Sequence, residues 1–343
     1  MVCGMSSFTA FKPLVKNGVG PSTVGIPSNT TLPAIEFLAT KFSTISLAQW
    51  QQRFEAGEIL NAIGRVMSPQ DSLIRESHLH YYRRIEDEPE LPFKAQIIFQ
   101  DHHLVVADKP HFMPVTPGGR YVQQSLLVQL KQQLNLPELS PVHRIDRETA
   151  GLVLFSVRAQ DRNAYQAMFR LREVEKTYEG IAGAPETSNQ YPTFPRTHKS
   201  MMVEDTQFFR MREVPTDEYP DAANYNSETW IDCIERLDVN DAARPTSETT
   251  PKSLARYLLK PITGQRHQLR VHMNALGLPL LGDQFYPVVK HRAKEPDKPD
   301  KPDKPDDFNS PLQLLAKTIS FQDPLTGAFR TFESDRQLTP SSS

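Results

Sequence analysis

The sequence predicts one large domain in which β-strands are combined with a few helices, preceded by a smaller accessory region. From residue 96 onward, short apolar runs typical of buried strands alternate with longer stretches of helical spacing. An acidic, proline-containing stretch at residues 86–92 separates these runs from the N-terminal part. The length of 343 residues agrees with one large domain or two ordinary ones.

The N-terminal part divides into a tail and an accessory region. Residues 1–33 contain Gly, Pro, Ser and Thr without a sustained hydrophobic period, so we expect an irregular tail there. Residues 34–90 are expected to form a small accessory domain. Within it, Ser46 is a suitable N-cap, apolar residues follow at helical spacing, and Gly57 ends the predicted short helix. Residues 59–84 are predicted to form short strands and turns.

The large domain is expected to span residues 91–337 and to begin with a β-hairpin. Gln96–Phe99 is its first strand, the chain turns at Asp101, and Leu104–Ala107 is its second strand. Further strands are predicted at residues 151–157, 177–182, 229–234, 256–259 and 312–321. Helices are predicted at residues 125–133, 161–172 and 266–276.

Two segments of this domain are expected to be surface excursions. Residues 184–228 are rich in Pro, Thr, Asn and Asp. Residues 294–307 repeat Lys-Pro-Asp and contain no apolar residue, so they cannot contribute to a core. We expect this low-complexity segment to be an exposed insertion, with a regulatory tether as the alternative.

Composition excludes several classes of protein. A formal net charge of −2, from 39 basic and 41 acidic residues, excludes a globally basic coat protein for nucleic acid, although a local basic groove stays possible. The two cysteines, Cys3 and Cys233, make neither a disulfide framework nor a Cys-rich zinc site. No apolar run is long enough for a membrane helix, and the first residues lack a secretory h-region. We therefore expect a cytoplasmic protein.

The charged segment HRIDRET, residues 143–149, is the most informative motif. It places Asp146 between Arg144 and Arg147, directly before the apolar run 151–155. Opposite charges nearby favour the ionised form of a carboxylate. An ionised Asp146 can act as a nucleophile, as a base, or only as the centre of a salt-bridge network.

A second segment, residues 252–282, concentrates positive charge. It contains basic side chains but no Asp or Glu. On a helix, Arg266 and Arg270 would share one face, because they are four residues apart. Backbone N–H groups near Thr263 and Gly264, together with the arginines, would suit a phosphate. The alternative is an ordinary solvated helix face.

A third candidate is Tyr178, in the predicted strand 177–182. In an alternating strand it shares a face with Lys176. Its ring can stack on a nucleic-acid base, and its hydroxyl can exchange a proton. A single tyrosine in a strand is also a common core residue, so both interpretations stay open.

Paired histidines raise the question of a metal site. The pairs are His78 and His80, His102 and His103, and His267 and His272. None has a carboxylate at a recognised metal-ligand spacing such as H-E-x-x-H, so we expect no metal. The sequence also lacks the glycine-rich phosphate motifs of nucleotide-binding proteins, so we expect no nucleotide cofactor.

Together these segments resemble the RluA-type RNA pseudouridine synthases. The pieces that match, in the family's order, are Ile97–Val115, His143–Phe155, Lys176–Tyr178, Pro261–Tyr286 and, as a closing strand, Leu312–Thr331. The resemblance implies an α+β pseudouridine synthase fold, with a central mixed, largely antiparallel β-sheet flanked by helices. It also implies an enzyme that isomerises uridine to pseudouridine in structured rRNA or tRNA, without metal, nucleotide or redox cofactor.

The resemblance also assigns roles to single residues. Asp146 matches the catalytic aspartate, Tyr178 the tyrosine that lies against the target uracil, and Arg270 the arginine that pairs with the aspartate. Arg144 matches an arginine that fills the space left by a flipped nucleotide, since a base buried in a stack must leave it to react. The residues expected to contact RNA are Arg144, Arg147, Arg266 and His267.

One motif departs from the family. Many relatives read T-G-R-x-H-Q, whereas this chain reads TGQRHQ from Thr263, so its arginine is displaced by one position. Relatives often carry a small N-terminal RNA-binding module of a type also found in a ribosomal protein, and residues 45–90 lie in the corresponding place. Two other functions stay open: an RNA-binding protein with an idle isomerase site, and a metal-dependent hydrolase. A monomer is the default expectation.

Overall fold

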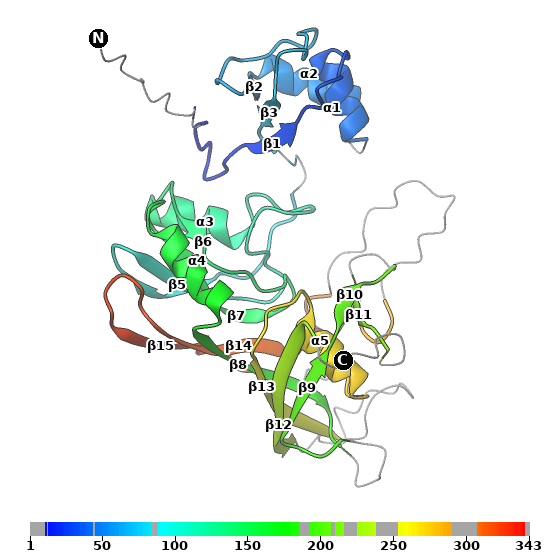
Figure 1. The fold of residues 1–343 in the computed structure, drawn as a ribbon, viewed down its shortest axis with the longest axis vertical. Coiled ribbons are helices and arrows are strands. Elements are labelled where there is room, and N and C mark those ends of the chain that lie inside the picture. The colour runs from blue at the N-terminus through cyan, green and yellow to red at the C-terminus, as the bar shows by residue number, and fades with distance from the viewer. Residues whose placement is uncertain are drawn as a thin grey trace, which may run out of the picture. The chain divides into compact units, whose positions relative to one another are not determined.

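The computed structural model describes residues 11, 13–43, 45–83, 85, 88–185, 192–206, 210–215, 225–237, 253–289 and 307–339. The chain forms two compact units (Figure 1). The first comprises residues 1–89, 117–124 and 128–137, and the second comprises residues 90–116, 125–127 and 138–343. Cys3, Lys252 and nearly all of the predicted insertion 294–307 lie outside the described residues.

The first unit is a small sheet covered by two helices. Strands β1 (Ser22–Gly25), β3 (His78–Tyr81) and β2 (Ile59–Asn61) pair antiparallel in that order. Helices α1 (Ala34–Lys41) and α2 (Leu47–Glu55) contribute Leu38 and Trp50 to a shared apolar core with Ile59 and Leu79.

The predicted helix after Ser46 is confirmed, and its start has a clear cause. The Ser46 hydroxyl accepts a hydrogen bond from the Gln49 N–H, and the Gln49 side chain accepts one from the Ser46 N–H. This reciprocal capping box satisfies backbone donors that the first helical turn leaves free. The expectation of an irregular tail up to residue 33 is wrong for Ser22–Gly25, because β1 pairs with β3 and buries Val24.

The second unit is built on a ten-stranded mixed sheet, in the order β4-β5-β7-β14-β8-β13-β12-β9, with β6 pairing with β7 and β15 with β14. Its strands are β4 (Gln96–Gln100), β5 (Leu104–Lys109), β6 (Ser140–Pro141), β7 (Ala150–Ser156), β8 (Val174–Gly183), β9 (Arg196–Ser200), β12 (Ser227–Leu237), β13 (Leu254–Pro261), β14 (Leu314–Gln322) and β15 (Phe329–Glu333). Only the β7–β14 pair is parallel among the described pairs. The sheet is therefore mixed and largely antiparallel, as expected.

The remaining elements are a two-stranded hairpin and three helices. The hairpin consists of β10 (Met202–Glu204) and β11 (Met211–Glu213). The helices are α3 (Leu126–Leu134), of which residues 128–134 belong to the first unit, and α4 (Arg162–Leu171) and α5 (Gln268–Ala275) of the second unit. The expected surface excursion 184–228 is thus wrong in part, because β9 pairs with β12 at the sheet edge. None of the helices in the described residues is long and apolar enough to cross a membrane.

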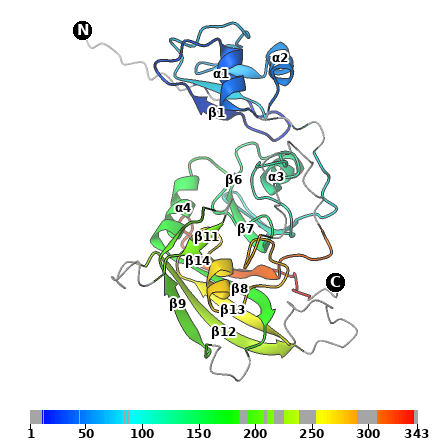
Figure 2. The ribbon, with the colours of Figure 1, turned by 90° about the vertical axis from the view of Figure 1, so that its right-hand side faces the viewer.

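Helix α5 is held on the sheet by its apolar side. Leu269 and Met273 belong to the same buried cluster as Ile231 of β12 and as Tyr257 and Leu259 of β13. In Figure 2, α5 is the yellow-orange helix next to β13. Because Leu269 and Met273 pack on the sheet, the polar side chains of α5 are directed at other residues. Arg270 contacts Asp146 and Asp283, and His272 contacts Thr229.

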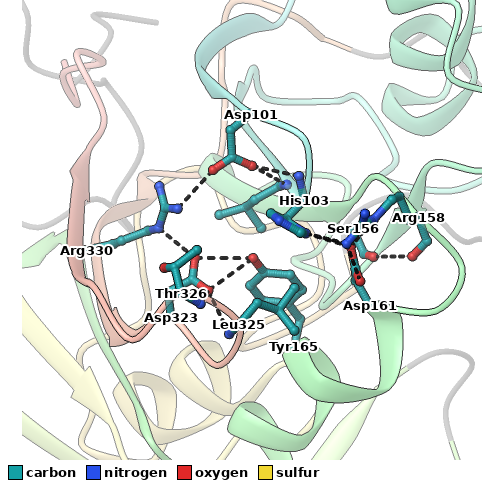
Figure 3. A network of polar contacts seen from close by, with 11 residues as sticks. Asp101, His103, Ser156, Arg158, Asp161, Tyr165, Asp323, Leu325, Thr326 and Arg330 are labelled. Carbon is teal, nitrogen blue, oxygen red and sulfur yellow. Dashed lines mark hydrogen bonds and ion pairs between the residues drawn. The ribbon is translucent and has the colours of Figure 1, made fainter.

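A polar network joins one end of the sheet to α4 (Figure 3). Arg330 of β15 bridges Asp101, in the β4–β5 turn, and Asp323, in the β14–β15 turn, at 2.9 and 2.6 Å. Asp323 also accepts a hydrogen bond from the Tyr165 hydroxyl of α4, at 3.2 Å. In the same network, Asp161 binds His103 and Arg158. The network links the β4–β5 and β14–β15 turns to each other and to α4, and we interpret its role as structural.

Candidate active site

Four paired residues form a row across strands β5, β7, β14 and β8 of the sheet. Lys109 of β5 lies opposite Gly151 of β7, Gly151 opposite Ala316 of β14, and Ala316 opposite Tyr178 of β8. At Gly151 φ is +112°, and a Cβ there would overlap the Ala316 carbonyl. The glycine therefore allows the two strands to approach each other and brings the start of β7 close to Tyr178.

Asp146 lies in the loop that leads into β7. The Thr149 N–H donates to the Asp146 carbonyl at 3.2 Å, which closes a turn immediately before the buried strand. The Asp146 side chain is 24% exposed, so it stays accessible to a substrate. Asp146 thus lies in a hydrogen-bonded turn directly before the buried strand β7.

Arg270 of α5 binds Asp146 and is itself fixed from behind. Its Nη1 donates to Asp146 Oδ2 at 3.2 Å. Its Nε and Nη2 donate to the two oxygens of Asp283 at 2.8 and 2.7 Å, and Glu148 lies 3.8 Å from Nη1. Both Arg270 and Asp283 are only 1% exposed. Such a bidentate pair leaves the guanidinium no alternative orientation.

Opposing effects set the pKa of Asp146. Burial raises it, whereas the adjacent His267 and Arg270 lower it, and the net result is a pKa below the ordinary carboxyl value. Burial lowers the pKa of His267 itself, against the opposite effect of Asp146. Since Arg270 is charged at every physiological pH, it is the partner that keeps Asp146 ionised.

Tyr178 shares this environment. It is partly buried on β8 and packs against the apolar cluster under α5. Burial raises the pKa of its phenol, and the negative charge of Asp146 raises it further. The hydroxyl therefore stays protonated, and the ring offers a flat surface beside the carboxylate.

His267 lies beside Asp146 and not on the open surface. Its Nε2 is 3.8 Å from Asp146 Oδ2, and its side chain is only 8% exposed. Its Nδ1 hydrogen-bonds the Tyr286 hydroxyl at 3.0 Å, and this hydroxyl also accepts from the Met211 N–H of β11. The residue has φ +56° and precedes α5, which begins at Gln268.

This late helix start corrects one expectation. Arg266 lies before the helix and pairs with Glu204 of β10 at 3.3 Å, whereas Arg270 is buried inside the helix. The two arginines therefore do not share a helix face. The side chain of Arg266 is 38% exposed, while that of Arg270 is 1% exposed.

The two remaining arginines of the motif differ in their surroundings. Arg144 is exposed, and no described residue makes an ion pair or hydrogen bond with its side chain. The Nε of Arg147 donates to Glu148 at 3.0 Å. His143 is structural, because its ring stacks on Phe169 and its Nε2 accepts from the Leu154 N–H.

Sequence reasoning missed several residues that support the site. The fully buried ammonium of Lys109 donates to the carbonyls of Pro110 and Arg147 at 2.9 and 3.0 Å. Burial lowers its pKa to about 7, although Glu148 and Asp146 act in the opposite direction. Asp283, Glu148 and Tyr286 were also missed as members of the site. Lys109 carried a signal, since a lysine at the end of an apolar strand needs a buried partner.

Comparisons with known proteins agree with this geometry. The family model described as RNA pseudouridylate synthase matches residues 103–275. The dual-specificity RNA pseudouridine synthase RluA of Haemophilus influenzae is 30% identical over 251 residues, covering 72% of this chain and 96% of that protein. An uncharacterised RNA pseudouridine synthase of Synechocystis is 27% identical over 255 residues, covering 74% and 78%.

A solved structure supports the fold. Human RNA pseudouridylate synthase domain containing 1 superposes with a TM-score of 0.51 at 20% identity, covering 75% of this chain and 89% of that chain. The family match spans Asp146 and the two residues that lie near its carboxylate, Tyr178 and Arg270. The chain therefore belongs to the RNA pseudouridylate synthase family as an RluA-type member, and it is an RNA pseudouridine synthase, an isomerase.

Proposed function

We propose that the protein isomerises specific uridines of structured rRNA or tRNA, with Asp146 as the catalytic carboxylate. The observation that carries the proposal is the contact of Asp146 with Arg270, which is itself fixed by Asp283. An aspartate that is ionised, partly exposed and held by a buried guanidinium is ready to act as a nucleophile or a base. Similarity to a relative named as a dual-specificity RNA pseudouridine synthase supports an RNA substrate.

The reaction requires the target nucleotide to leave its stack. The glycosidic bond to uracil N1 breaks, the base turns, and C5 bonds to the ribose while its hydrogen is lost to solvent and N1 takes up a proton. These atoms are inaccessible within a helix, so we propose that the uridine is flipped out against Tyr178. The exposed Arg144, without an ion-pair partner in the described part of the chain, is available to occupy the vacated space.

We further propose that Arg147 and Arg266 contact the RNA backbone. Both side chains are partly exposed, at 29% and 38%, and arginine binds phosphate oxygens well. For His267, burial beside Asp146 favours a contact with the flipped nucleotide over one with an external phosphate.

Release of tritium from RNA labelled at uracil C5 tests the proposal directly. Wild type should release tritium from its rRNA or tRNA substrate, and Asp146→Asn should release none while binding the same RNA within a few-fold. Glu333→Gln, at an exposed ion pair with Lys317, serves as a control that should retain full activity. Retained activity of Asp146→Asn would remove Asp146 from the chemistry, and binding without release by wild type would favour a binding protein with an idle site.

A cytoplasmic location and a monomeric state stay predictions. Sedimentation of the purified chain with and without RNA tests the second, and a concentration-dependent dimer would contradict it. The accessory domain predicted at residues 34–90 is proposed to add RNA affinity, and measuring RNA binding after removal of residues 1–89 would test this role.

A further inference from the structure

Three separate segments bring two histidines and a glutamate together beside α5. His198 comes from β9, Glu213 ends β11, and His272 lies in α5, two residues after Arg270. One ligand atom of each lies within 4.8 Å of the other two. His198 Nε2 is 2.8 Å from Glu213 Oε1, and His272 Nε2 is 3.9 Å from the same oxygen.

The cluster is shielded from solvent. The side chains of His198, Glu213 and His272 are 16%, 22% and 0% exposed, respectively. A carboxylate in such a place needs a compensating positive charge. In the described part of the chain, the ion pairs of the Glu213 carboxylate are with these two imidazoles and with no lysine or arginine.

A second layer of contacts orients His272. Its Nδ1 hydrogen-bonds the Thr229 hydroxyl at 2.9 Å, and the Gln268 amide donates to the same hydroxyl at 2.9 Å. Nε2 then faces Glu213 and His198, with the hydroxyls of Ser227 and Ser200 at 3.0 and 3.3 Å. Fixing one ring nitrogen of a histidine while directing the other at the ion is the usual arrangement around bound metals.

We propose that His198, Glu213 and His272 bind a first-row divalent cation, with Zn²⁺ as the preferred ion. Two imidazoles and one carboxylate form a donor set typical of zinc, and the negative charge of Glu213 then balances the ion. Three protein ligands leave a fourth position for water or for one of the serine hydroxyls. Hard ions such as Mg²⁺ prefer oxygen ligands and are not expected at this site.

The ion would tie the hairpin β10–β11 to the helix that carries Arg270. Strand β11 already contacts the α5 region through Met211, whose N–H donates to Tyr286, the partner of His267. A metal at Glu213 would fix the other end of the same short strand. It would therefore act as a structural ion beside the active site and would take no part in the isomerisation.

Metal binding by the intact, RNA-free protein tests this inference. After treatment with a chelator, wild type is titrated with Zn²⁺ and, in parallel, with Co²⁺, whose visible absorption reports tetrahedral coordination. We expect one ion per chain, absorption typical of tetrahedral Co²⁺, and no competition by millimolar Mg²⁺. Absence of Zn²⁺ binding would overturn the proposal and leave a hydrogen-bonded polar cluster.

Variants then locate the ion. Glu213→Gln and His198→Gln should weaken Zn²⁺ binding by at least about 100-fold. Glu228→Gln is a matched control. Glu228 is 20% exposed, similar to Glu213, and it pairs with Lys199 across β12 and β9, the strand that also carries His198. Equal Zn²⁺ affinity in Glu213→Gln and Glu228→Gln would place the ion elsewhere and refute the site.

Thermal unfolding distinguishes a variant that has lost a Zn²⁺ ligand from a variant that binds Zn²⁺ poorly because it is unfolded. Zn²⁺ at a hundredfold excess over its dissociation constant should raise the Tm of wild type and Glu228→Gln by roughly 5 °C or more. Glu213→Gln should have a similar Tm without metal but no Zn²⁺-dependent rise. Since neither measurement involves RNA, a failure of the proposed uridine chemistry would leave this test unaffected.

Discussion

Replacing Arg270 by methionine tests the central interaction of the candidate active site. Methionine is similar in length and apolar, so the change removes the charge and the hydrogen bonds but leaves most of the packing. In wild type, three carboxylates share this one guanidinium: Asp283 at 2.7 Å, Asp146 at 3.2 Å and Glu148 at 3.8 Å. The variant leaves them facing one another without their common cation.

The expected cost follows from the burial of the pair. Removing one partner of a buried ion pair typically costs about 3–5 kcal/mol, because the other charge stays buried and uncompensated. Arg270 and Asp283 are both 1% exposed, so the upper part of this range is expected here. In comparison, Glu333→Gln removes an ion pair in which Glu333 is 65% exposed, and should cost less than about 1 kcal/mol.

The pH dependence distinguishes lost charge from lost packing. In wild type, the lowered pKa of Asp146 contributes stability above the ordinary carboxyl range and loses it as the pH falls through the folded-state pKa. Arg270→Met removes one of the groups that lower this pKa, so the effect of burial gains weight and the pKa of Asp146 should rise, which weakens its contribution to stability at neutral pH. The stability deficit of Arg270→Met relative to wild type should therefore be larger at pH 7.5 than at pH 5.

Chemical denaturation measures this deficit within the second unit. Trp230 on β12 reports on that unit, and a Trp50→Phe background removes the fluorescence of the first unit. In this background, unfolding by urea at pH 7.5 and 5, followed by Trp230 fluorescence, compares unchanged Arg270 with Arg270→Met and Arg270→Lys. An equal deficit at both pH values would refute the electrostatic reasoning and assign the cost to packing.

Two other changes test the site. Tyr178→Phe keeps the ring but removes a hydroxyl whose pKa is raised by burial and by Asp146. If the hydroxyl transfers a proton, single-turnover assays should show that the reaction rate falls by about 100-fold or more, and a fall of less than about tenfold would restrict Tyr178 to packing. Gly151→Ala should destabilise the second unit by about 3 kcal/mol or more in urea unfolding, because its Cβ would overlap the Ala316 carbonyl. Gly327→Ala, with φ +73° but open space around its Cβ, should cost only about 1 kcal/mol, and similar costs for both would contradict the close-approach argument.

The elements that sequence patterns predicted best are those with local causes. The helix after Ser46 has a capping box, and α4, predicted at residues 161–172, buries Tyr165 and Met168 one helical turn apart. Strand β1 was missed because four residues with a single buried side chain carry little pattern, and only their pairing with β3 makes them a strand. The start of α5 was placed too early because the left-handed conformation of His267 is not visible in its residue type.

The residues proposed to react and the residues that support them were predictable to different extents. Asp146, Tyr178 and Arg270 lie in segments with recognisable motifs. Asp283 and Lys109 also lie in matching segments, but their roles depend on contacts with residues far away in the chain. The proposed metal ligands, separated by 15 and 59 positions, have no common spacing at all, and the histidine pairs in the sequence gave no indication of them.

The register of the sheet is what makes the separate motifs one site. Lys109, Gly151, Ala316 and Tyr178 lie in one row because β5, β7, β14 and β8 are paired at those positions. A shift of β14 by one residue would turn its side chains to the other face and would remove Ala316 from its close contact with Gly151. The turn that carries Asp146 comes directly before β7 and Gly151, a member of this row, and Arg270 contacts Asp146 from α5. Strand pairing thus positions the carboxylate of Asp146 near Tyr178, and Arg270 of α5 favours its ionised form. Neither effect alone would produce an ionised, accessible aspartate beside a tyrosine.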